Sequence, residues 1–263
     1  MDKNRHREKS TSRDILLTVV CVTVVCLSTV FMLSCSSKDI KPPYTDEKDS
    51  YERAVKLIED KKYTDGRDLL TEVINRDRTK TYAPLAQLKI AESYIKDDES
   101  TLAIEEYRKF LSSYPDNRYA PNAQYQIAAL TFSQIEGADR GYKAAESAIK
   151  EFKKLAELYP RNPYRDVIEL RLQKCRNVLA EHEFYVGKFY LKKGAFKAAI
   201  GRFNTVMEKY SDFTAISEVY YHMAMSYKGL KDTDKAREYF QKVMEVAKED
   251  KLRKDAQKGL NSL

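Results

Sequence analysis

The chain has 263 residues, of which 33% are charged, and its formal net charge is +7. It contains 8 glycines and no tryptophan, and residues that favour helices dominate it. The positive excess is modest, and the 19 tyrosines fall at repeat positions of a helical pattern instead of forming a stacking surface for bases, so no nucleic-acid partner is expected.

The N-terminus has the organisation of an export signal. Residues 1–14 are rich in lysine and arginine, and no charged residue occurs from Ile15 to Leu33. The segment ends in Met32-Leu33-Ser34-Cys35, which resembles the lipobox of bacterial lipoproteins. We therefore predict a signal peptide at residues 1–34, then a lipidated Cys35 and a flexible tether over residues 35–46. An uncleaved membrane anchor is the alternative, because the apolar run is just long enough to span a bilayer.

The residue after the cysteine bears on the compartment. The lipobox resemblance associates aspartate at this position with retention in the inner membrane, and this chain has Ser36. Its sequence therefore implies an anchor in the outer membrane, on the periplasmic face of a Gram-negative bacterium. Of the four cysteines, Cys21 and Cys26 leave with the signal, and Cys175 alone remains besides Cys35. We expect no intramolecular disulfide, no metal and no cofactor other than the covalent diacylglycerol lipid on Cys35.

A repeat of 37 residues dominates the rest of the chain. The hexad Tyr82–Gln87 recurs almost unchanged as Tyr119–Gln124. Around it, small residues are followed by aromatic or aliphatic residues at constant offsets, as in Ala91, Tyr94, Ala103 and Tyr107. Steps of three and four keep residues on one helix face, and small residues on paired helices allow close approach. The pattern resembles the tetratricopeptide repeat, a hairpin of two helices that recurs about every 34 residues.

The repeat predicts an all-α fold, a right-handed superhelix of about five helical hairpins. The period lengthens once, between Ala128 and Gly187. Some of the extra residues in this longer step contain glycine and predict a loop. The other extra residues follow Pro163 and contain no glycine or proline, and they predict one long helix over residues 164–193. We expect three repeats in residues 47–162, and the long helix, two more repeats and an end helix in residues 163–263.

No catalytic constellation is present, so we expect a binding protein that is not an enzyme. His182 lacks the second histidine that a zinc-protease helix needs, and no glycine-rich phosphate loop occurs. In tetratricopeptide stacks the first helix of each hairpin lines the concave face. Counting from the small residue of each repeat predicts a mostly apolar groove for an extended peptide, lined by Tyr51, Val55, Ile58, Leu88, Glu92, Ile95, Tyr125 and Phe132.

Several segments point to one family. They are Ala180–Tyr190, Gly194–Phe196 and Tyr210–Asp212, together with the turns Tyr114–Asn117 and Tyr159–Asn162. With the lipobox and the long helix, they make the chain resemble the BamD family, the lipoproteins of the outer-membrane β-barrel assembly machinery. The chain departs from the family pattern after Tyr210, where it has a serine in place of proline. We expect this change to loosen the end of the helix at Tyr210.

The resemblance implies a division of labour. The front repeats would bind the C-terminal targeting strands of unfolded outer-membrane proteins, which are extended and end in aromatic residues. The rear repeats would bind the barrel subunit BamA, and other accessory lipoproteins are possible partners. Arg202 matches a family arginine that contacts an acidic residue of that subunit.

Two alternatives remain open. One is a different tetratricopeptide lipoprotein, such as a pilotin for a secretin or an envelope coordinator linked to Tol-Pal, although no sustained heptads of the coordinator's coiled coil precede Tyr51. The other is an adaptor for an enzyme that supplies the chemistry itself.

Overall fold

The computed structural model describes residues 44–138 and 140–263, which contain helices and no strands. The predicted signal peptide, Cys35 and most of the tether lie outside these residues. The helices are α2 (Glu47–Glu59), α3 (Tyr63–Arg76), α4 (Ala83–Lys96), α5 (Ser100–Ser113), α6 (Ala120–Ser133), α7 (Tyr142–Leu158), α8 (Arg165–Lys192), α9 (Phe196–Lys209), α10 (Ile216–Gly229), α11 (Thr233–Val246) and α12 (Asp250–Asn261). The prediction of an all-α fold is confirmed.

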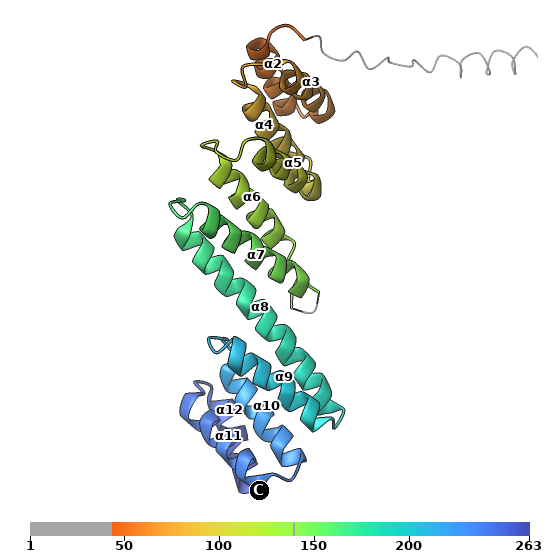
Figure 1. The fold of residues 1–263 in the computed structure, drawn as a ribbon. Coiled ribbons are helices and arrows are strands. Elements are labelled where there is room, and N and C mark those ends of the chain that lie inside the picture. Colours follow the sequence, from red (N-terminus) through yellow and green to blue (C-terminus); the bar gives the residue numbers. More distant parts are fainter. Residues whose placement is uncertain (1–43, 139) are drawn as a thin grey trace, which may run out of the picture. The chain divides into compact units, whose positions relative to one another are not determined.

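The helices pair in chain order as hairpins (Figure 1). The pairs are α2 with α3, α4 with α5, α6 with α7, α8 with α9, and α10 with α11, and each pair also packs against the next. The last helix, α12, packs on α11 and α10. In the described part of the chain, no helix is both long enough and apolar enough to cross a membrane. The division at residue 162 between front and rear repeats stays a prediction.

The repeat residues form the core. Ala54, Ala91, Ala128 and Ala224, the small residues of the first helices, are fully buried. The large residues that follow in the second helices, among them Phe152, Phe203 and Phe240, are also fully buried. Small side chains let the helices of a hairpin approach, and the aromatic rings fill the space between neighbouring helices.

Tyrosines mark the helix boundaries. Tyr82, Tyr119 and Tyr164 are the N-cap residues of α4, α6 and α8. The C-cap of α9 is Tyr210, whose amide donates to the carbonyl of Val206 at 2.9 Å. The equivalent bond at Tyr114, before a proline, is 2.8 Å. The end of α9, which has no proline at residue 211, therefore keeps the same closing hydrogen bond, and the expectation that this end is looser stays a prediction.

The long helix and the extra loop occur where the sequence places them. Helix α8 spans Arg165–Lys192, as the absence of glycine and proline between Tyr164 and Val186 predicts. The loop between α6 and α7 contacts this helix: the Nδ1 atom of His182 lies 3.0 Å from the carbonyl oxygen of Ala138. The His182 ring also stacks on Tyr142, with ring centroids 4.4 Å apart.

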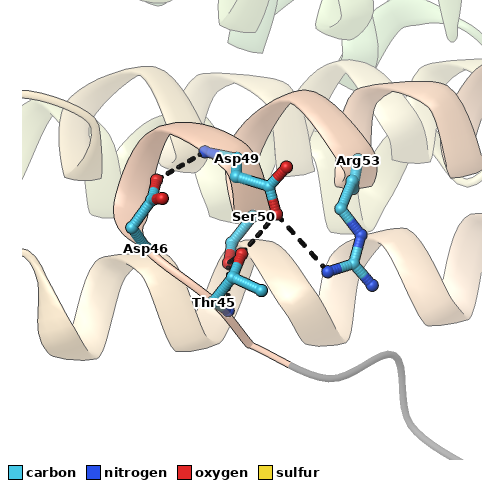
Figure 2. A network of polar contacts seen from close by, with 5 residues as sticks. All are labelled: Thr45, Asp46, Asp49, Ser50 and Arg53. Atoms are coloured by element: carbon cyan, nitrogen blue, oxygen red, sulfur yellow. Dashed lines mark hydrogen bonds and ion pairs between the residues drawn. The ribbon is translucent and has the colours of Figure 1, made fainter.

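Polar contacts fix the start of the first described helix (Figure 2). The carboxylate of Asp46 accepts a hydrogen bond from the amide of Asp49 at 2.8 Å and so caps α2. The Asp49 carboxylate in turn accepts from the hydroxyl of Thr45 and pairs with Arg53. Tyr44 packs beneath Arg76, whose guanidinium lies 4.4 Å from the ring centroid. These contacts attach residues 44–46 to the first hairpin.

Candidate functional site

A pocket of about 520 Å³ lies along the first helices of three successive hairpins and beside the start of the long helix. Helices α2, α4 and α6 contribute to it, together with the residues that precede α6 and α8. Its lining is mixed, with aromatic, aliphatic and charged side chains: Tyr51, Leu85, Leu88, Lys89, Glu92, Arg118, Tyr119, Pro121, Asn122, Pro163 and Tyr164.

Side-chain amides set the positions of two lining tyrosines. The Asn117 Oδ1 atom accepts a hydrogen bond from the amide of Tyr119 at 3.0 Å. In the next repeat, Asn162 Oδ1 accepts from the amide of Tyr164 at 2.9 Å. The Nδ2 atom of Asn122 donates to the hydroxyl of Tyr164 at 2.8 Å. These contacts hold the starts of α6 and α8 together at the pocket.

The charges in the pocket are unequally paired. Lys89 and Glu92 pair at 2.5 Å along α4. Burial lowers the pKa of Lys89, but the hydrogen bond and charge of Glu92 outweigh it, so the pKa is raised. Burial raises the pKa of the Tyr51 hydroxyl. Among the described residues, Arg118 has no carboxylate at ion-pair distance, and its Nη2 atom donates to the Tyr119 hydroxyl at 2.8 Å.

Three of the eight predicted groove residues line this pocket: Tyr51, Leu88 and Glu92. The interpretation of Ile58 was wrong, because its side chain is only 2% exposed and belongs to the core of the first hairpin. Gly66, on the facing helix, makes this possible: a Cβ at residue 66 would lie 2.7 Å from Cγ1 of Ile58. Val55 and Ile95 are partly buried and do not line the pocket.

The long helix covers the other two predicted residues. The guanidinium of Arg171 lies 5.3 Å from the ring centroid of Tyr125 and 5.4 Å from that of Phe132. Tyr125 also stacks on Tyr164, and Phe132 packs edge-on against Phe152. Neither ring lines the pocket, and Tyr125 contacts it through Tyr164.

Sequence reasoning missed the residues at the helix starts. Tyr119, Pro121 and Asn122 belong to the second copy of the duplicated hexad and line the pocket. Tyr164 is the equivalent tyrosine of the following repeat, displaced by the eight-residue loop. The recurrence of this tyrosine at three helix starts was the signal that could have found them.

Arg202, on α9, is half exposed and already has a partner in its own chain. Its Nη1 atom lies 3.0 Å from Oε2 of Glu183 and 3.3 Å from Oε1, and its side chain is 44% exposed. The hydrogen bond and charge of Glu183 raise the pKa of the arginine. Glu183 belongs to the segment Ala180–Tyr190 that carries the family resemblance. The described residues contain no cluster of side chains that could hold a metal ion.

A comparison with known families decides the assignment. The profile of the YfiO family, described as outer membrane lipoprotein, matches residues 43–243. The chain belongs to the YfiO family of outer-membrane lipoproteins. The matched region contains every residue of the pocket as well as Arg202 and Glu183.

Individual relatives agree with the YfiO assignment, and each is named outer membrane protein assembly factor BamD. The protein of Caulobacter vibrioides is 32% identical over 48% of this chain, but the match spans only 41% of that protein. The Vibrio cholerae protein is 24% identical over 72% of this chain and 83% of its own length. The Haemophilus influenzae protein is 24% identical over 89% of both chains.

Solved structures similar to this YfiO-family chain are more distant. A Thermus thermophilus tetratricopeptide protein, TTC0263, covers 81% of this chain and 98% of its own at 17% identity, with a TM-score of 0.35. The TPR2AB domain of yeast Sti1, solved as a complex with pHSP90, covers 76% of both chains at 12% identity and a TM-score of 0.41.

Proposed function

We propose that this chain is a lipid-anchored scaffold subunit of the outer-membrane β-barrel assembly machinery. Membership of the YfiO family and the shared name of the relatives support this role. Cys35 would carry the lipid and hold the helical repeats at the periplasmic face of the outer membrane. The scaffold would act by binding, without catalysis or a bound cofactor, and would have no nucleic-acid partner.

The pocket at the first helices would receive the targeting strand of an unfolded outer-membrane protein. The single observation that carries this proposal is the grouping of Tyr51, Tyr119 and Tyr164 around one pocket. Aromatic walls bind aromatic side chains through offset or edge-on contacts, while their hydroxyls pair with polar groups. An extended strand that ends in an aromatic residue would place that residue among the three rings.

The rear repeats would bind the barrel subunit, a BamA-type protein. Arg202 is half exposed beside Glu183, so an acidic residue of the partner could join or replace this pair. Glu183 lies on the long helix α8, where Tyr185 and Phe189 are 60% and 52% exposed. Exposed aromatic residues are frequent anchors of interfaces. Other accessory lipoproteins could bind elsewhere on the same scaffold.

Affinity purification from native membranes tests this role. We expect the wild-type chain to recover a BamA-type barrel subunit. Arg202→Glu should release that subunit with an unchanged circular dichroism spectrum, since the new carboxylate would repel both Glu183 and an acidic partner. Arg237→Glu, an exposed residue of α11, is the matched control and should retain the subunit. Recovery of a secretin, or retention of the barrel subunit by a folded Arg202→Glu variant, would contradict the assignment.

A further inference from the structure

Arg118 is the unbalanced charge at the rim of the pocket. Among the residues that line the pocket, only Lys89, Glu92 and Arg118 carry charge at neutral pH, and the first two neutralise each other at 2.5 Å. Arg118 is exposed, and its guanidinium lies 4.7 Å from the ring centroid of Tyr119. Its hydrogen bond to the Tyr119 hydroxyl orients the guanidinium but leaves its charge without a counterion.

Two helix starts add positive potential at the same place. Pro121 and Asn122 lie in the first turn of α6, and Tyr164 is the N-cap of α8. All three line the pocket. Neither N-cap side chain accepts a hydrogen bond from its helix. At α6 the amide of Ala120 donates to the Asn117 carbonyl and Pro121 has no N–H, so the contribution of this helix start is its dipole and not a row of free amides. Helix N-termini carry partial positive charge, which favours an anion beside them.

The anion that fits this pocket must come with an aromatic group. The arginine and the two helix starts border the same space as the rings of Tyr51, Tyr119 and Tyr164. A peptide whose last residue is aromatic carries both features within one residue: the ring and the free α-carboxylate. An internal aromatic residue of a strand offers a neutral amide in place of the carboxylate.

We propose that Arg118 binds the terminal α-carboxylate of the strand in this pocket, so that the site distinguishes a chain end from an internal segment. This inference rests on the proposed function and deepens it, because it names the chemical group that the site recognises. Arginine is suited to the role because its planar guanidinium can donate two parallel hydrogen bonds to a carboxylate. Lys89, already paired with Glu92, would contribute less.

A comparison of two peptides with three proteins tests the proposal. The peptides are a short fluorescent peptide ending in phenylalanine with a free carboxylate, and the same peptide with a C-terminal amide. The proteins are the full chain in detergent, Arg118→Gln, and Arg237→Gln as a control with the same change of charge on α11. Dissociation constants come from fluorescence anisotropy, and circular dichroism checks the fold of each variant.

We expect the wild-type chain and Arg237→Gln to bind the acid about fivefold more tightly than the amide, a difference typical of an exposed charged pair. Arg118→Gln should bind both peptides with the affinity that the wild type has for the amide. In wild type, the preference should shrink when the salt concentration is raised to about 0.5 M. Equal binding of acid and amide by the wild type would overturn the role of Arg118 while leaving strand binding intact. Failure of the wild type to bind either peptide would overturn the proposed function of the pocket as well.

Discussion

Tyr164, the residue that starts the long helix, stacks on Tyr125 of α6 with ring centroids 3.9 Å apart and an angle of 10° between the planes. The hydroxyl of Tyr164 accepts the hydrogen bond from Asn122. One tyrosine therefore joins the third hairpin to the long helix and forms part of the pocket wall. Any distortion of this contact should be felt both in stability and in ligand binding.

Two substitutions at Tyr164 separate its contacts. Tyr164→Phe keeps the stack and loses the hydrogen bond, and should lower the free energy of unfolding by about 1 kcal/mol. Tyr164→Ala loses the stack and the buried ring area too, and should lower it by about 2–3 kcal/mol. Urea denaturation measures both values. Equal stability of the two variants would show that the stack contributes nothing.

The close approach of α8 and α9 depends on a glycine. A Cβ atom at Gly187 would lie 2.8 Å from Cδ1 of Phe203, and closer still to Cε1. Gly187→Ala should therefore destabilise the chain by about 1–3 kcal/mol, although alanine is the better helix former. Gly201, on α9, has open space at the same position, so Gly201→Ala should stabilise by about 0.5–1 kcal/mol. Thermal unfolding of both variants decides, and a stabilised Gly187→Ala variant would refute the packing argument.

His222 gives the fold an acid sensitivity. Burial lowers the pKa of His222 from its ordinary value of 6.5 to about 4, and the charge of Lys188 acts in the same direction. The unfolded chain takes up this proton near pH 6.5 and the folded chain only near pH 4, so stability is lost as the pH falls through this window. The loss from this residue should be about 2–3 kcal/mol.

The variant His222→Phe isolates that effect. Phenylalanine suits the site, because the histidine ring packs against Phe184 and Phe203. Denaturation at neutral pH and at about pH 4.5 should show a smaller loss of stability for the variant than for the wild type. If the two chains lose stability in parallel, His222 is not the group responsible.

The sequence was informative where the repeat imposes packing. The alanines and aromatic residues at fixed offsets had to be buried for hairpins to stack, and residues 164–193 contain no helix breaker apart from Gly187, which packs against Phe203. Both features depend on spacing alone, which can be read from one chain. The positions of the duplicated hexad could also be read, but their role as a pocket wall could not.

The errors arose where packing between distant residues decides. Ile58 turns into the core because Gly66 leaves room for it, and a rule that counts offsets along one helix ignores the facing helix. Tyr125 and Phe132 lie beneath Arg171, which is in another hairpin. Arg118 precedes a helix and has no repeat equivalent with its charge, so no periodic pattern drew attention to it.

The central claim is that the pocket receives the end of a strand from an unfolded outer-membrane protein. The most direct measurement places a photo-crosslinking amino acid at Leu85, in the pocket wall, and in a second chain at Leu102, an exposed residue of α5. Each purified chain is irradiated with the peptide that ends in phenylalanine, and the cross-linked product is identified by mass spectrometry. The account predicts cross-links to the last residues of the peptide from position 85 and none from position 102. Cross-links from position 102 alone would contradict it.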